Sequence, residues 1–275
     1  MLENLSSRLL GFLSPYTSYF YYVGGVTRDH LLGFTTRDID VVAPISFAAM
    51  RHLHASLKDE ALNQLHFIEG FSNIRFELEG NHIDLVPLRK ESYKPQSPYP
   101  EVSEGSFMED ALRRDFTVNA IYLKVSRGSA PKWIDPFNGI KDLEDSLLKT
   151  IREEAFDEDP TRIIRLYIYH YRYQFRIDAK TLDLARSATY GKLQPGLLLK
   201  YLQKVLDEKN PLLLNQLIHM GVFKGIGIHR CLAPATSAAG EELLLELFKA
   251  NPGALAGFEE HKLYRLLTQA SKGGT

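Results

Sequence analysis

One stretch near the N-terminus, Tyr21–Val42, constrains the fold of this chain more than any other part of the sequence. It begins with an aromatic and aliphatic run typical of a buried strand, which Gly24 and Gly25 interrupt before a short helical segment. The chain then returns as a run in which Asp38 and Asp40 alternate with aliphatic residues. Because alternate side chains of a strand share one face, both carboxylates should point the same way. The stretch therefore predicts a strand, a glycine turn, a helix and a second strand with two carboxylates on one face.

These features suit a nucleoside triphosphate with a divalent cation. Carboxylates two residues apart on a strand lie about 7 Å apart and can hold one or two Mg²⁺ ions. A glycine pair before a helix leaves backbone N–H groups available to an anion. Each feature alone has a structural interpretation, since Gly-Gly is often a plain turn and Asp-x-Asp a solvated strand edge.

The composition sets broad limits. A chain of 275 residues can form one large domain or two moderate ones, and its 44% hydrophobic and 24% charged residues are ordinary for a globular protein. A formal net charge of −1 gives no general attraction to nucleic acid, so an RNA partner requires a local basic patch. The single cysteine, Cys231, excludes an internal disulfide. With no basic N-terminal leader and no apolar run of membrane-spanning length, we expect a cytoplasmic protein without a membrane partner.

Hydrophobic patterns divide the chain into strands and helices before residue 155 and helices after it. In the first part we expect helices at 1–17 and 47–57, the latter capped by Ser46, strands near 65–69, 73–78, 81–87 and 147–151, and a tight turn at 79–81. In the second part we expect helices near 178–187, 195–208, 211–220, 238–249 and 257–269. Residues 90–106 contain three prolines and no apolar period, which predicts a mobile loop.

Asp84 lies in a predicted strand that could adjoin the one containing Asp38 and Asp40. It could contact metal or substrate there, or supply ordinary strand polarity.

Two further motifs carry groups suited to nucleotides. Residues 113–120 read R-R-D-F-T-V-N-A, and a planar guanidinium such as that of Arg114 binds phosphate with two parallel hydrogen bonds. Asp115 and Asn119 in the same string suit sugar hydroxyls. Residues 135–143 read D-P-F-N-G-I-K-D-L, in which Asp-Pro and Asn-Gly favour a turn that joins sheet and helix.

A third motif, E-D-P-T-R at 158–162, opens a helical run that extends to residue 176. Asp159 and Arg162 are three residues apart and share a helix face, although Glu158 and Asp159 also suit helix capping. At helical spacing the run continues with a basic and aromatic stripe suited to RNA, or to a solvated face over packed tyrosines. The stripe consists of Arg165, Tyr169, Arg172 and Arg176.

Together these strings resemble class II nucleotidyltransferases of the DNA polymerase beta superfamily. This class contains tRNA CCA-adding enzymes and bacterial poly(A) polymerases. The resemblance rests on G-G-x-x-R-D, L-G and D-x-D at 24–40, on R-R-D-F-T-x-N-A, on D-P-x-x-G-x-x-D-L and on E-D-x-x-R. It implies an α+β protein. Residues 1–155 would form a polymerase beta-like nucleotidyltransferase head, with a mixed sheet and helices, and residues 156–275 an all-helical neck and body domain that binds RNA and the nucleobase.

The resemblance also assigns roles to individual residues. The catalytic groups that hold two Mg²⁺ ions would be Asp38 and Asp40, the triphosphate would be bound by Gly24, Gly25 and Arg28, and the nucleotide by Arg114, Asp115 and Asn119. The base would be selected by Asp159 and Arg162, with the site supported by Glu158, Arg165 and Asp84. RNA would be bound by Arg172 and Arg176. Two features depart from the class. No Glu-Arg pair occurs near 190–205, and the chain is short, so a tail that grips the tRNA elbow is expected to be absent or reduced.

The implied function is template-independent addition of C and A to the 3′ end of tRNA from CTP and ATP. A carboxylate beside a guanidinium offers an acceptor next to a donor, which complements the Watson–Crick edges of C and A and mismatches those of U and G. A poly(A) polymerase and a CC-only or A-only enzyme share every motif. A catalytically silent RNA-binding protein would be expected to lose Asp38 or Asp40. A nucleotidyltransferase acting on proteins or small molecules would have no need of the second and third motifs.

Overall fold

A computed structural model describes residues 2–57, 62–94, 97, 99–233, 241–255, 257, 261–263 and 265. The chain forms two compact units, the first comprising Met1–Tyr93 and Pro100–Arg152 and the second Lys94–Tyr99 and Glu153–Thr275. In the described part of the chain no helix is both long and apolar enough to cross a membrane.

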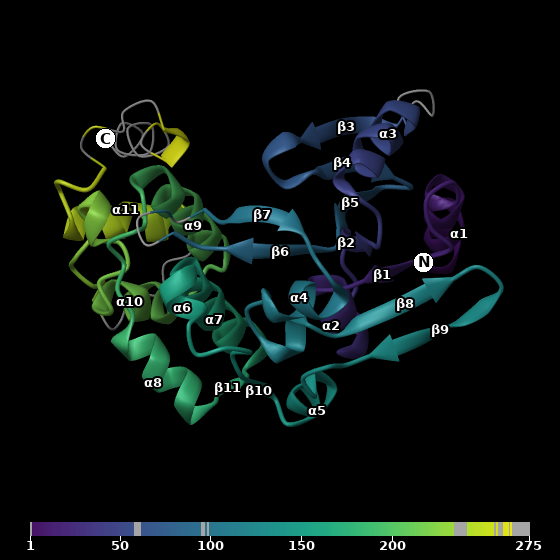
Figure 1. The fold of residues 1–275 in the computed structure, drawn as a ribbon. Coiled ribbons are helices and arrows are strands. Elements are labelled where there is room, and N and C mark those ends of the chain that lie inside the picture. Colours follow the sequence, from purple (N-terminus) through teal and green to yellow (C-terminus); the bar gives the residue numbers. More distant parts are fainter. Residues whose placement is uncertain are drawn as a thin grey trace. The chain divides into compact units, whose positions relative to one another are not determined.

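A mixed sheet is the centre of the first unit (Figure 1). Its strands are β1 (Tyr19–Tyr22), β2 (Asp38–Ala43), β3 (Asn63–Ile68), β4 (Asn73–Leu78), β5 (Asn81–Pro87), β8 (Tyr122–Ser126) and β9 (Ser129–Ile134). Within the described residues the order is β3-β4-β5-β2-β1-β8-β9. β2 and β5 are parallel, with Asp40 opposite Asp84, whereas the other neighbouring strands are antiparallel.

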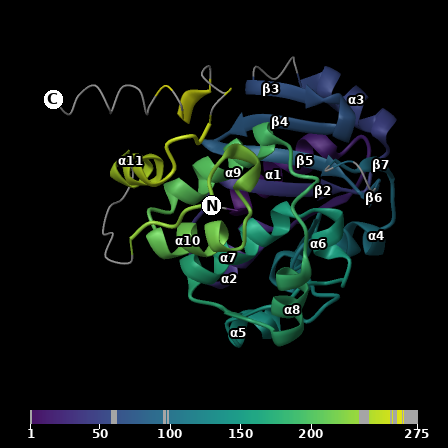
Figure 2. The ribbon, with the colours of Figure 1, turned by 90° about the vertical axis from the view of Figure 1, so that its left-hand side faces the viewer.

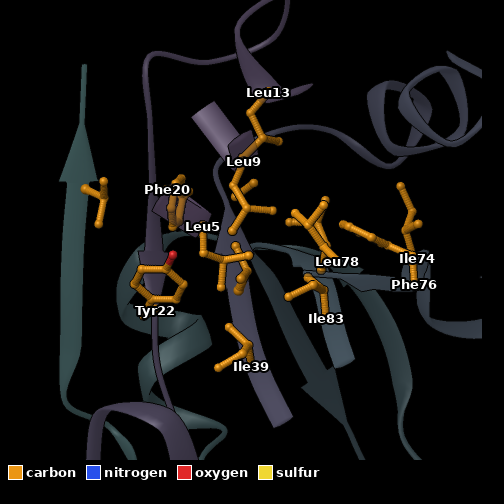
Figure 3. Close-up of a cluster of buried hydrophobic side chains, with 14 of the residues drawn as sticks. Leu5, Leu9, Leu13, Phe20, Tyr22, Ile39, Ile74, Phe76, Leu78 and Ile83 are labelled. Carbon is orange, nitrogen blue, oxygen red and sulfur yellow. The ribbon is translucent and has the colours of Figure 1, made fainter. Parts of the chain in front are cut away.

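The helices of this unit are α1 (Leu2–Leu13), α2 (Gly25–Leu31), α3 (Phe47–Leu57), α4 (Phe107–Leu112) and α5 (Gly139–Glu144). One face of the sheet is covered by an apolar cluster to which α1 contributes three leucines (Figure 3). The labelled members are Leu5, Leu9, Leu13, Phe20, Tyr22, Ile39, Ile74, Phe76, Leu78 and Ile83. Because Ile39 and Val41 are buried on this face, the alternation of the strand directs Asp38 and Asp40 to the opposite face, as predicted.

The second unit is mainly helical (Figure 2). Its helices are α6 (Ala155–Glu158), α7 (Thr161–Tyr173), α8 (Ala179–Ser187), α9 (Pro195–Asp207), α10 (Pro211–His219) and α11 (Glu241–Ala250). It also contains the short strand β11 (Arg176–Ile177), whereas the short strand β10 (Leu147–Leu148) belongs to the first unit. Buried leucines, isoleucines and valines fill the spaces where α7, α9 and α10 meet. The α+β class predicted from the sequence is confirmed, and most of the helix predicted at 257–269 lies outside the described residues.

Two predictions of local structure were wrong. The expected loop at 90–106 contains an antiparallel pair, β6 (Arg89–Ser92) with β7 (Glu101–Glu104). Backbone hydrogen bonds hold this pair without an apolar alternation, so the sequence pattern gave no signal. The helix expected to continue to residue 176 ends at Tyr173, because Gln174 adopts a left-handed conformation (φ 56°). Arg176 therefore lies in β11 and does not continue the helical stripe.

Candidate active site

The glycine turn approaches the carboxylates closely. Gly24 follows β1 and precedes α2 with φ 79° and ψ −132°, a conformation that glycine adopts without strain. A Cβ at this position would lie 2.8 Å from Oδ2 of Asp40 and 3.7 Å from Nη1 of Arg114. The turn, the strand and the arginine motif thus converge, and both the conformation and the space require glycine.

The carboxylates on β2 carry incompletely compensated negative charge. Asp38 and Asp40 are both exposed, and Asp84 lies opposite Asp40 on the parallel strand β5. Desolvation by the surrounding atoms, followed by the charge of Asp84, raises the pKa of Asp40 to about 6. Asp84 itself accepts hydrogen bonds from Arg75 Nη2 (3.0 Å) and Asn73 Nδ2 (3.4 Å).

Asp38 and Asp40 fit a hard divalent cation. Carboxylate oxygens are the donors that Mg²⁺ prefers, and a cation between the two carboxylates would offset their mutual repulsion. Across the residues that the structure describes, no group of three or more His, Cys, Asp or Glu side chains has metal-binding spacing. Asp84 pairs with Arg75 and lies opposite Asp40 on the neighbouring strand, and its support of the two carboxylates stays a prediction.

A buried carboxylate holds the two arginines of the second motif. Asp110 is fully buried and accepts hydrogen bonds from Arg113 Nη2 (2.7 Å), Arg114 Nη2 (3.1 Å) and the Tyr122 hydroxyl (2.8 Å). Tyr122 in turn accepts from Arg114 Nε (2.8 Å). Burial alone would raise the pKa of Asp110, but Arg113 and Arg114 outweigh it and lower the pKa to about 2. Asp110 therefore remains ionised and fixes both guanidinium groups.

The β6 strand is tied to the same network. Glu91 Oε1 accepts hydrogen bonds from Arg89 Nη2 (2.8 Å) and Arg113 Nη1 (3.2 Å), and Arg89 Nη1 donates to Asn73 Oδ1 (3.0 Å). The network borders a pocket of about 260 Å³. Its lining comprises Val23, Asp40, Val42, Phe71, Asn73, Arg75, Asp84, Val86, Arg89, Arg113 and Arg114. Four arginines against two aspartates make this pocket suitable for phosphate groups.

Sequence reasoning missed Asp110, Arg89 and Glu91. For Asp110 a signal existed, because it precedes Arg113 and Arg114 by three and four residues, the spacing of side-chain pairs on a helix. For Arg89 and Glu91 no local signal existed, because their partners come from distant parts of the sequence.

A chain of contacts joins Arg28, predicted to bind the triphosphate, to Asn119 and Asp115, which were predicted to bind the nucleotide. Arg28 Nη1 donates to Asn119 Oδ1 (2.7 Å), and Asn119 Nδ2 donates to Asp115 Oδ1 (2.9 Å). Arg28 is 3% exposed and also pairs with Asp29. The three residues thus connect α2 to the R-R-D-F-T-x-N-A segment and do not line the pocket. Their direct contact with a nucleotide stays a prediction.

The D-P-x-x-G motif has the structural role expected of it. Asp135 accepts hydrogen bonds from the N–H groups of Gly139 (2.7 Å) and Ile140 (2.9 Å) at the start of α5. A Cβ at Gly139 would lie 2.2 Å from the carbonyl oxygen of Thr117, and Thr117 Oγ1 donates to Asp142 (2.6 Å). The motif therefore packs α5 directly against the R-R-D-F-T-x-N-A segment.

In the second unit the predicted base-selecting residues lie together. Asp159 Oδ2 is 3.9 Å from Arg162 Nε and accepts a hydrogen bond from Arg165 Nη2 (3.2 Å). Arg162 is 2% exposed and pairs with Glu158 (3.4 Å). Asp159 Oδ1 also accepts from the backbone N–H of Thr161 (2.9 Å), so it caps α7. The structure thus shows the capping interaction, and base selection stays a prediction.

The residues predicted to bind RNA are distributed over several elements. Arg165 donates to the Tyr201 hydroxyl (2.7 Å), and Arg172 forms an ion pair with Glu208 of the α9 C-cap. Arg176 is exposed in β11.

A mixed sheet with a glycine turn against paired aspartates, and arginines gathered beside them, is the arrangement expected of a polymerase beta-like nucleotidyltransferase head. Residues 20–149 match the family model described as "Poly A polymerase head domain". The chain is 32% identical over 168 residues to the A-adding tRNA nucleotidyltransferase of Aquifex aeolicus, covering 61% of this chain and 20% of that protein. It is 33% identical over 144 residues to the CC-adding tRNA nucleotidyltransferase of Deinococcus radiodurans, covering 52% and 38%.

Solved structures agree with this assignment. The CCA-adding enzyme of Thermotoga maritima complexed with tRNA superposes with a TM-score of 0.66 at 28% identity, covering 85% of this chain and 54% of that one. Residues 20–149 therefore resemble the poly(A) polymerase head domain, and the chain is similar to class II tRNA nucleotidyltransferases, as the sequence motifs predicted. It spans 20% and 38% of the length of the two curated relatives named above.

Proposed function

We propose that this protein adds C and A nucleotides to the 3′ end of tRNA, without a template, from CTP and ATP. The observation that carries the proposal is the close approach of Gly24 to Asp40 and Arg114, two residues that line one polar pocket. A Cβ on the glycine would touch the Asp40 carboxylate. The names of the relatives, which are A-adding, CC-adding and CCA-adding enzymes, support the substrate class.

In this proposal the head binds the triphosphate and the RNA 3′ end. Arg113 and Arg114, held by Asp110, face the phosphates, while the backbone at Gly24 allows the triphosphate to approach β2. Asp38 and Asp40 would hold two Mg²⁺ ions, and these ions would supply activation of the 3′-hydroxyl and stabilisation of the pyrophosphate. The protein groups contribute positioning and fixed charge, which account for most of the catalysis of phosphoryl-type transfer.

The helical unit selects the base. Asp159 and Arg162 place an acceptor beside a donor, 3.9 Å apart, and this order matches the amino group and ring nitrogen of C and A. The carbonyl and N–H of U and G present the reverse order, which leaves polar groups mismatched. Division of the chain near residue 155 into a catalytic head and a base- and RNA-binding part is a component of the proposal.

The test is direct incorporation. The protein is incubated with Mg²⁺ and tRNA that lacks its last three nucleotides, with each NTP separately and then with mixtures, and the products are sequenced. If the protein is a CCA-adding enzyme, incubation with CTP alone should add C residues, and incubation with CTP and ATP together should add CCA. Products that end in CC only, in a single A or in a poly(A) tract would contradict the proposal and would indicate a CC-adding enzyme, an A-adding enzyme or a poly(A) polymerase, respectively.

Matched variants link the activity to the site. Asp40→Ala and Asp38→Ala should abolish incorporation and leave the melting temperature close to that of the native protein, because both side chains are exposed. Near-normal incorporation by Asp40→Ala in Mg²⁺ would show that the catalytic site has been assigned wrongly.

A further inference from the structure

A second cavity, of about 640 Å³, lies within the helical unit and is separate from the proposed active site. Its walls come from α7, β11, α8, the segment that follows α8, and α10. The lining residues are Tyr167, His170, Arg176, Ile177, Leu182, Arg186, Ala188, Tyr190, Gln216, His219 and Met220. The volume is within the range of sites that hold one small ligand, roughly 300–1,000 Å³.

The lining combines aromatic rings with cations. Tyr167, His170, Tyr190 and His219 supply the rings, and none of the lining residues is acidic. Burial, followed by the charge of Tyr167, raises the pKa of Tyr190 to about 12, so the Tyr190 hydroxyl is neutral at pH 7. Aromatic faces of this kind stack nucleobases, irrespective of base identity.

His170 has a defined orientation in this wall. Its Nδ1 lies 2.6 Å from the carbonyl oxygen of Phe175. A carbonyl oxygen can only accept, so Nδ1 donates and the ring is fixed against the backbone. The Tyr167 ring meets the His170 ring edge-on, with centroids 6.4 Å apart. The aromatic part of the cavity is therefore preorganised.

Two arginines contribute the positive charge of the cavity. Arg186 has a side chain that is 67% exposed, with Asp183 at 3.7 Å as an ion-pair partner, and Arg176 is also exposed. An exposed ion pair of this length is weak, so Asp183 does not prevent Arg186 from binding a phosphate. Because both arginines reach solvent, a phosphate bound by them can continue into a longer chain.

We propose that this cavity binds one nucleotide of the RNA substrate, with the base against the tyrosine and histidine rings and a phosphate on Arg176 and Arg186. The proposal rests on the proposed function for the identity of the RNA, and it gives Arg176 a place in a binding pocket in the second unit. The same chemistry would also accept a free nucleoside monophosphate, so the experiment includes both ligands.

The experiment measures equilibrium binding by the full chain. Fluorescence anisotropy gives the Kd for labelled tRNA that lacks its last three nucleotides, and competition with AMP and CMP gives the affinity for free nucleotides. The variants are Tyr190→Leu, which removes a ring, and the double variant Arg176→Gln with Arg186→Gln, which removes both cations. Tyr190→Phe keeps the ring, and Arg230→Gln removes an exposed arginine of the same unit that does not line the cavity.

Tyr190→Leu should raise the Kd for tRNA about fivefold or more, the effect of losing one stacked base, and Tyr190→Phe should leave it unchanged. The double arginine variant should raise the Kd and reduce the slope of log Kd against log salt by about one, as expected for one lost phosphate contact. Arg230→Gln should change neither quantity.

Steady-state kinetics separates this inference from the proposed function. In the cavity variants the KM for tRNA should rise, while the KM for CTP and the kcat at saturating tRNA stay unchanged. If the native protein incorporates no nucleotide but the cavity variants still lose RNA affinity, the proposed function fails and the cavity assignment stands.

Unchanged tRNA affinity in both Tyr190→Leu and the double arginine variant would overturn the inference. So would an equal loss in Arg230→Gln, because that result would show only a general effect of charge. Specific binding of AMP or CMP that is lost in the variants without any change in tRNA affinity would assign the cavity to a free nucleotide and also overturn it.

Discussion

Substituting Gly24 by alanine should reduce catalysis far more than it reduces stability. The new Cβ would lie 2.8 Å from Oδ2 of Asp40, which is closer than van der Waals contact permits. Backbone atoms fix Gly24 at the start of α2, so the carboxylate has to move. A displacement of about 1 Å of a catalytic group can lower the rate about 10²-fold, and we expect a decrease of this order in kcat.

The stability effect comes from the backbone. A residue other than glycine held at φ 79° costs on the order of 1–3 kcal/mol, so Gly24→Ala should unfold at a lower urea concentration than the native protein. Single-turnover incorporation of CTP into tRNA lacking its 3′ nucleotides measures the catalytic loss below the unfolding transition.

Gly33→Ala is the matched control. Gly33 also has φ 79°, but a Cβ there would meet no atom within 4 Å. This variant should show a comparable loss of stability with an unchanged rate of incorporation. If both variants lost activity equally, or if Gly24→Ala kept its rate, the close approach of Gly24 to Asp40 would have no catalytic importance and the argument for this site would be refuted.

Three further predictions concern the polar networks. Asp110→Asn should lower the free energy of unfolding by about 2 kcal/mol at pH 7, because a carboxylate whose folded pKa is depressed to about 2 contributes stability above its unfolded pKa. In urea titrations the difference in unfolding free energy from the native protein should shrink as the pH falls from about 4 towards about 2. A difference that does not depend on pH would contradict this. Asp159→Asn keeps an oxygen that can accept the hydrogen bond from the Thr161 backbone N–H but replaces the carboxylate. It should therefore preserve the melting temperature and narrow the preference for CTP and ATP over UTP in competition assays. Unchanged nucleotide selectivity would leave Asp159 with a capping role alone. Arg172→Ala removes a partially exposed ion pair with Glu208. Because Glu208 already binds this guanidinium, tRNA affinity measured at two salt concentrations should fall less than in the cavity variants. An equal or larger loss of affinity would make Arg172 a principal RNA contact.

Local patterns predicted several parts of the site correctly. Strand alternation places Asp38 and Asp40 on the face opposite the apolar cluster, and Ser46 accepts a hydrogen bond from the backbone of Ala49 at the start of α3, as a cap should. These features depend on residues a few positions apart, so the period of a strand or the first turn of a helix is enough to predict them.

The sequence by itself therefore determined the resemblance to the poly(A) polymerase head domain, the α+β class and the face of β2 that presents the carboxylates, because motif strings and short-range periodicity carry that information. Only the tertiary structure decided which groups surround them. The parallel pairing of β2 with β5 places Asp84 beside Asp40, and the burial of Asp110 fixes Arg113 and Arg114. The left-handed turn at Gln174 likewise moves Arg176 from a helical stripe to the wall of a cavity. Such contacts join residues distant in the sequence, and no local period specifies their pairing.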